Sequence, residues 1–149
     1  EFFINDISEQ SSFNRIGKKG KKLKVKTTTL YDYVTENNIK KINFIKIDCE
    51  GHDLFVLQGL KKYLNNKFID IIQFEYGGCN IDSHTNLRDF YELIENKEFV
   101  IGKLMPKNIE IRRYAHHMEN FHYANYVIIS KEFINSNTWI KKYLKGEIK

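Results

Sequence analysis

Three acidic residues directly follow apolar stretches of the sequence, where they could hold a cation or accept hydrogen bonds. Asp48 and Glu50 come after the run FIKI, and Glu75 comes after the run IDIIQF. The first run leads through Gly51 into a segment of helical period that opens near His52. Free backbone N–H groups at the start of a helix favour ionised carboxylates, by about 0.3–1 kcal/mol each. We therefore expect all three acids to be anionic at neutral pH.

The simplest alternative gives these acids a structural role. Asp48 or Glu50 would cap the helix, and Gly51 would supply the backbone angle that the turn requires. For one acid alone, this alternative is the better one. Three acids at the ends of two adjoining apolar runs favour a ligand site, because ligands of open α/β sheets bind outside the carboxyl ends of the strands.

The surrounding sequence predicts a strand–helix–strand unit that would bring the acids together. Residues 44–48 have apolar, β-branched character with a single lysine before the final Asp48, as in a central parallel strand. Apolar residues recur with helical spacing from Asp53 onward, and after the break NNK residues 69–76 predict a second strand. Such a unit requires a parallel sheet, so the acids should share one edge.

The sequence before this unit predicts one loop, one strand and one helix. Residues 1–22 show no sustained period and are expected to form a loop, and residues 23–30 alternate as in a short strand. Helical spacing follows over residues 29–39, with Thr29 in position to cap the helix.

The second half of the chain is predicted to pass from helix to short strands. Residues 85–97 have helical spacing, with Thr85 as the expected N-cap. Short connections predict antiparallel pairing among three strands, which are residues 98–105, 109–114 and 123–130. An amphipathic helix is expected over residues 137–146. Its predicted inward side chains are Trp139, Ile140, Tyr143 and Leu144.

Length and composition indicate one folded domain. The chain has 149 residues, of which 42% are apolar and 29% are charged, with a single proline. No stretch approaches the roughly 18–20 apolar residues of a membrane span, and the first residues lack a signal-peptide pattern. Cys49 and Cys79 show no CxxC spacing, which favours reduced thiols. We therefore expect a cytoplasmic protein.

Two other clusters suggest alternative functions. His116, His117 and His122 lie near Glu119, but their spacing matches no recognised ligand pattern, so no metal is predicted. The basic loop over residues 15–26 could track phosphates, which makes a nucleic-acid-binding module the main rival. Its basic residues are Arg15, Lys18, Lys19, Lys21, Lys22, Lys24 and Lys26. A net charge of +5 is modest for a nucleic-acid binder, so nucleic acid is the less favoured partner.

Four segments in order carry a resemblance to a known family: VKTTTLYDYV, INFIKIDCEGHDLFVLQGL, IDIIQFEYGG and NFHYANYVIIS. From about Val25 to Ser130 the chain resembles the second half of the FkbM family of S-adenosylmethionine-dependent methyltransferases. The resemblance implies an α/β, Rossmann-like class I methyltransferase fold, of which this chain is the C-terminal half, with parallel strands followed by antiparallel strands. It also implies S-adenosylmethionine as the cofactor and methyl transfer to oxygen, with a hydroxyl of a sugar, lipid or small natural product as the acceptor.

The resemblance also implies roles for individual residues. Asp48 matches the KID-x-EG motif beside the methyl group of the cofactor, so it is the expected cofactor-binding residue and the first candidate for the base. The expected catalytic residues are Asp48, Glu50, His52 and Glu75. Asp48 or His52 would be the base, and Glu50 or Glu75 would orient the acceptor or a cation. The expected substrate-binding residues, which match the late YANY segment, are Tyr123, Asn125 and Tyr126.

The sequence departs from the family pattern in several places. Tyr31 stands where aspartate is common, and Asp53 stands where glutamate is more usual. The glycine-rich cofactor loop has no counterpart, so we expect residues 1–149 to be a single N-terminally truncated domain that lacks roughly 90 residues upstream. This chain alone would then bind the cofactor weakly and be inactive. The missing half or another chain would cover the sheet edge, and an inactive half-domain scaffold is the remaining alternative.

Overall fold

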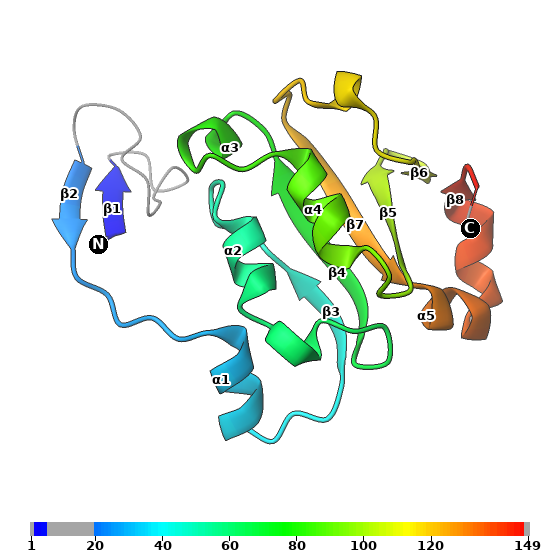
Figure 1. Ribbon diagram of the computed structural model, residues 1–149, viewed down its shortest axis with the longest axis horizontal. Helices are drawn as coiled ribbons and strands as arrows, with labels where there is room; N and C mark the ends of the chain where they lie inside the picture. Colours follow the sequence, from blue (N-terminus) through cyan, green and yellow to red (C-terminus); the bar gives the residue numbers. More distant parts are fainter. Residues whose placement is uncertain (1, 6–19, 148–149) are drawn as a thin grey trace.

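The computed structural model describes residues 2–5 and 20–147, with side chains from Lys24 onward, and is built on a six-stranded sheet (Figure 1). The strands lie in the order β3-β4-β7-β5-β6-β8. Their bounds are β3 Ile42–Lys46, β4 Ile69–Tyr76, β5 Phe99–Leu104, β6 Ile109–Ile111, β7 Ala124–Ser130 and β8 Leu144–Lys145. Strand β3 is parallel to β4, whereas β7 runs antiparallel between β4 and β5. The predicted α/β class with a mixed sheet is confirmed.

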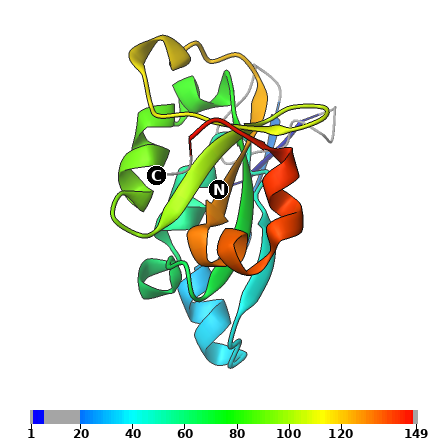
Figure 2. The same cartoon turned by 90° about the vertical axis from the view of Figure 1, so that its right-hand side faces the viewer.

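Different helices cover the two faces of the sheet, because apolar side chains alternate between the faces. Helices α2 and α4 cover one face, where the ring of Phe74 stacks on that of Phe90 at 4.1 Å. Helix α5 and a 3-10 helix cover the other face over β5, β6 and β7. Figure 2 shows α4 and α5 on opposite sides of the sheet. The bounds are α2 Asp53–Gln58, α4 Leu87–Ile94, α5 Lys131–Ser136 and the 3-10 helix Thr138–Tyr143.

One predicted helix cap is present and another is wrong. Helix α1 (Leu30–Glu36) is capped by Thr29, whose hydroxyl accepts a backbone N–H of the first turn at 3.0 Å, as predicted. Helix α4 is capped by Asn86, and the prediction of Thr85 is wrong. Thr85 is buried, and its hydroxyl accepts a hydrogen bond from the side chain of Asn80 at 2.9 Å. The Thr85 hydroxyl therefore binds the buried side chain of Asn80 and does not cap the helix.

The N-terminal prediction is wrong in two places. Residues Phe2–Asn5 (β1) pair with Gly20–Leu23 (β2) as an antiparallel two-stranded sheet, where the sequence predicts a loop. The strand predicted over residues 23–30 ends at Leu23, and residues 24–29 form no regular element before α1. The basic residues Arg15, Lys18 and Lys19 lie outside the described residues.

The predicted terminal helix over residues 137–146 is also wrong. A 3-10 helix occupies its first part, and pairing of β8 with β6 draws Leu144 into a strand. Of the side chains predicted to pack inward, Ile140 is buried, Trp139 is 56% exposed and Tyr143 is 42% exposed. The short ladder to β6 outweighs the helical spacing, because it pairs backbone groups that a helix end leaves free.

Three short elements complete the described fold, and they are the 3-10 helices Lys61–Tyr63 and His116–Met118 and helix α3 (Cys79–Asp82). Strand β3 lies at the end of the strand order, and the side chain of Phe44 on it is 54% exposed. Across residues 2–5 and 20–147, no helix is long and apolar enough to cross a membrane.

Candidate functional site

The carboxyl ends of β3 and β4 lie at one edge of the sheet, because the two strands are parallel neighbours. Lys46 pairs with Gln73, and the N–H of Ile47 donates to the carbonyl of Gln73 at 2.8 Å. Asp48 follows β3 at this edge, and Glu75 lies near the end of β4. The fold therefore brings the two acids to the same edge, as the strand–helix–strand pattern predicts.

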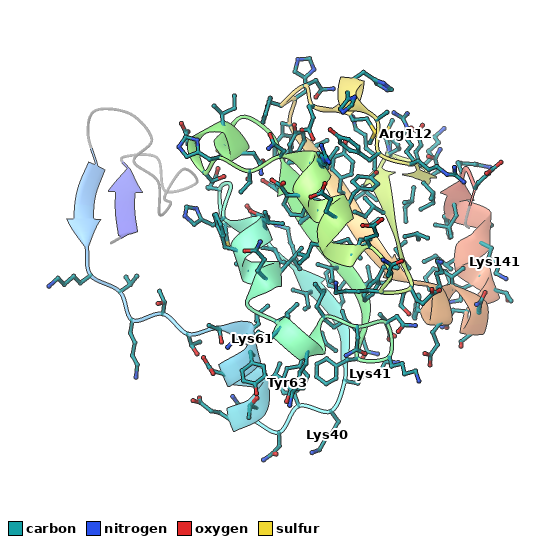
Figure 3. The ribbon with its side chains drawn as sticks, viewed as in Figure 1. Lys40, Lys41, Lys61, Tyr63, Arg112 and Lys141 are labelled. Carbon is teal, nitrogen blue, oxygen red and sulfur yellow. The ribbon has the colours of Figure 1, made fainter. Side chains whose placement is uncertain are left out.

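Two lysines lie at the opposite end of the two parallel strands. Lys40 and Lys41 precede β3, and Figure 3 shows them with Tyr63 at the other end of the fold. The ammonium of Lys41 lies 3.0 Å from the carboxylate of Asp70, at the start of β4. Two lysines thus lie where the strands begin, and one of them is paired with an aspartate.

A chain of polar side chains leads to Glu75 across β4 and β7. The amide of Gln73 donates to the side-chain oxygen of Asn125 at 2.8 Å, and the amide of Asn125 donates to the phenol oxygen of Tyr123 at 3.3 Å. The Tyr123 hydroxyl in turn donates to Oε1 of Glu75 at 2.6 Å. The Tyr123 side chain is 69% exposed, so a ligand from solvent could reach this carboxylate.

The surroundings of Glu75 make it a better proton acceptor than an ordinary glutamate. Burial is the largest cause that raises its pKa, and the negative charges of Asp48, Asp53 and Glu50 raise it further. The hydrogen bond from Tyr123 acts in the opposite direction. A carboxylate whose pKa is raised holds a proton more strongly, which is what a general base requires.

Asp48 has a different environment from Glu75. Its side chain is exposed, and its Oδ2 lies 2.6 Å from the ammonium of Lys46. This hydrogen bond and the charge of Asp48 raise the pKa of Lys46. Asp48 is therefore a solvent-exposed carboxylate that is paired with the ammonium of Lys46.

Asp53 connects the ends of β3 and β4 by hydrogen bonds to their backbone. Its side chain is fully buried, at 0% exposure. Its Oδ1 accepts the backbone N–H of Glu75 at 3.2 Å, and its Oδ2 accepts the backbone N–H of Cys49 at 3.3 Å. Burial raises the pKa of Asp53 and outweighs these two hydrogen bonds and a third, from the backbone of Asp53 itself, which lower it. Sequence reasoning missed this residue, because an acid in the first turn of a helix is common and carries no signal of burial.

The turn after β3 packs directly on the turn after β4. Glu50 and Gly51 both have a positive φ, of 49° and 90°, so the chain makes two successive left-handed steps. A Cβ on Gly51 would lie 2.4 Å from the carbonyl oxygen of Cys79, so only glycine fits. The Cys79 thiol donates to the Glu50 carboxylate at 3.1 Å, and burial together with Glu50 raises the pKa of this thiol to about 12.

His52 lines a groove beside the acidic edge. The groove has a volume of about 420 Å³ and is mainly apolar. The ring of His52 lies 5.5 Å from that of Phe55, and burial lowers the pKa of His52. The lining residues are Thr27, Thr28, Thr29, Leu30, Cys49, His52, Phe55, Val56 and Gly59. His52 is thus close to Asp48 and Glu50 in sequence, but its ring lines this groove.

The structure does not bring Tyr126 to the polar chain. Its ring is buried on the opposite face of the sheet from Asn125, where it packs at 5.7 Å on Phe74.

Glu119 has a structural role, because its carboxylate accepts a hydrogen bond from the hydroxyl of Tyr76 at 2.6 Å and two more from N–H groups at the start of α4. In the part of the chain that the structure describes, no three His, Cys, Asp or Glu residues form a group that could hold a metal ion.

The fold and this edge together define a mixed α/β domain with its candidate ligand site at the carboxyl ends of parallel strands. A family model described as the methyltransferase FkbM domain matches residues 2–127. The chain belongs to this family, and its domain is a methyltransferase domain. The resemblance that the sequence motifs indicate is therefore confirmed. No curated protein and no solved structure gives a significant match.

Proposed function

We propose that the protein transfers a methyl group from S-adenosylmethionine to a hydroxyl of a sugar, lipid or small natural product, with Glu75 as the base. The single observation that carries this proposal is the 2.6 Å hydrogen bond from the Tyr123 hydroxyl to Glu75. An acceptor hydroxyl beside Tyr123 would donate to the same carboxylate. Its proton would then pass to Glu75 as the acceptor oxygen bonds to the methyl carbon and the bond between that carbon and sulfur breaks, with a neutral thioether as the leaving group.

When it is bound, S-adenosylmethionine supplies an activated methyl group on a positively charged sulfur. The groove around His52 and Phe55 fits the flat base of this cofactor, because the two rings offer an apolar surface and the threonines offer hydroxyl groups. Thr27 and Thr28 would hold polar groups of the base at the rim of the groove. The negative charges of Asp48 and Glu50 beside the groove favour a cationic ligand.

The proposal divides the expected catalytic residues by environment. Glu75 is half-buried with a raised pKa, which supports the role of base. Asp48 is exposed and paired with Lys46, which supports a role in orienting the ligand rather than in removing a proton. The contact of Asn125 with the Tyr123 phenol oxygen supports a role for both in holding the acceptor.

The test uses the protein encoded by the complete reading frame, with S-adenosylmethionine labelled in the methyl group and a panel of sugars, lipids and phenols. We expect label in an ether product from a hydroxyl acceptor, and none from the analogue that lacks this hydroxyl. Glu75→Gln should lower kcat by about 10²–10⁴ with the KM for S-adenosylmethionine little changed. Glu36→Gln, at the exposed end of α1, is the control. A Glu75→Gln variant as active as this control would reject Glu75 as the base.

A further inference from the structure

We propose that Asp53 is a positioning residue that sets the place of Glu75 by tying the ends of β3 and β4 together. The inference rests on the proposed function, because it takes Glu75 as the group that accepts the proton. Asp53 itself does not meet a ligand, since its side chain is fully buried beneath the site. It acts on the reaction through the backbone of Glu75 and through its own charge.

The carboxylate of Asp53 accepts backbone N–H groups from both chain segments at the point where the ladder between β3 and β4 ends. The last paired residues are Lys46 and Gln73, and the N–H of Ile47 adds one more bond to Gln73. Beyond this point the strands separate into their turns. Asp53 bridges them with one oxygen at 3.2 Å from the N–H of Glu75 and the other at 3.3 Å from the N–H of Cys49.

Only a carboxylate supplies this bridge. Both partners are N–H donors, so the bridging group must offer two acceptors a fixed distance apart. Asparagine would turn an NH₂ group toward one of the two donors, and alanine would leave both buried donors without a partner. Because a buried carboxylate is unfavourable unless it is well hydrogen-bonded, the two backbone bonds are needed to keep Asp53 in place.

Asp53 also has an electrostatic effect on Glu75. Its charge raises the pKa of Glu75, in the same direction as burial. Several other groups act on this carboxyl or are acted on by it. They are Lys46 and Asp48 at the end of β3, Glu50 in the next turn, Cys79 after β4, and Tyr123 before β7. Removal of the Asp53 charge should therefore lower the pKa of Glu75, whereas a merely structural role would predict no such change.

The test compares Asp53→Asn and Asp53→Glu in the protein from the complete reading frame. We expect Asp53→Asn to lower kcat by about 10–100-fold, because a base displaced by about 1 Å loses up to 10²-fold, while the KM for S-adenosylmethionine stays within about twofold. The acid limb of the pH–rate profile should move to lower pH. Asp53→Glu keeps the charge but changes the reach, so its acid limb should stay near that of the wild type while kcat falls.

Amide and carboxyl NMR signals separate this inference from the proposed function. In Asp53→Asn, the amide signals of Cys49 and Glu75 should shift, and the Glu75 carboxyl should titrate at lower pH, whether or not methyl transfer is observed. If the wild type transfers no methyl group, the proposed function fails and these NMR signals still decide the role of Asp53. A folded Asp53→Asn with wild-type kcat or an unchanged Glu75 titration overturns the inference. Failure of both variants to fold also overturns it, in favour of a purely structural role.

Discussion

The contact between Gly51 and Cys79 gives the sharpest prediction on stability. Gly51→Ala adds a Cβ at a position where φ is +90° and where the carbonyl oxygen of Cys79 would lie 2.4 Å away. The carbonyl carbon of Cys79 would lie 2.7 Å away, so the obstacle is backbone and cannot turn aside as a side chain would.

Two terms set the size of the effect. A left-handed conformation is less favourable for alanine than for glycine by roughly 1–2 kcal/mol. Relief of the contact requires the Cys79 backbone to move by about 1 Å, since non-bonded heavy atoms rest near 3.5 Å, and overpacking of this kind destabilises by about 1–3 kcal/mol. We therefore expect Gly51→Ala to lower the free energy of unfolding by about 2–5 kcal/mol.

Gly78→Ala is the matched control, because Gly78 lies in the neighbouring turn with φ of −57° and has no atom within 4 Å of a Cβ built on it. This change should be neutral or should stabilise the fold by about 0.4–1 kcal/mol, through the unfolded chain. Urea unfolding, monitored by circular dichroism, gives the free energy of unfolding of both variants by the same linear extrapolation. Equal stabilities of Gly51→Ala and Gly78→Ala would refute the close packing of the two turns.

Three further predictions concern single groups near the site. Glu119→Gln should destabilise the fold by about 1–3 kcal/mol in thermal unfolding, because it weakens charge-assisted bonds to the start of α4. Burial raises the pKa of Glu119, but its hydrogen bonds outweigh burial and lower it, so its stabilisation should vanish as pH falls through that pKa. Tyr123→Phe removes a bond that lowers the pKa of Glu75, so the Glu75 carboxyl should titrate at higher pH by NMR, and an unchanged titration would contradict the bond. Burial raises the pKa of the Cys49 thiol, and burial together with Glu50 raises the pKa of the Cys79 thiol to about 12. Iodoacetamide at pH 8 should therefore alkylate both far more slowly than it alkylates glutathione.

The sequence was sufficient for features that depend on local spacing. The run FIKI and the run before Glu75 are mainly apolar because both strands are covered on at least one face. The helical spacing from Asp53 predicts a helix between them, and a strand–helix–strand unit has parallel strands. Thr29 caps α1 because its hydroxyl lies at the first turn, where it accepts the N–H of Asp32 and donates to the Asp32 carboxylate. These patterns were enough to bring Asp48 and Glu75 to one edge.

Features that depend on distant partners could not be read from the sequence. Thr85 has the sequence of a cap, but the Asn80 amide takes its hydroxyl. Tyr126 shares the segment YANY with Asn125, yet strand alternation sends its ring to the opposite face, into the core. Asp53 has the pattern of an exposed first-turn acid, and only the turns after both strands bury it.

Parallel pH titrations of one protein test whether Glu75 takes the proton from the acceptor. The carboxyl signal of Glu75 is followed by carbon NMR in the free protein, and kcat/KM for methyl transfer is followed over the same range. Because kcat/KM reports the free enzyme, we expect one shared midpoint above the 4.5 of an ordinary glutamate, with the rate rising as Glu75 ionises. A rate that stays constant while the Glu75 carboxyl titrates would rule out Glu75 as the base.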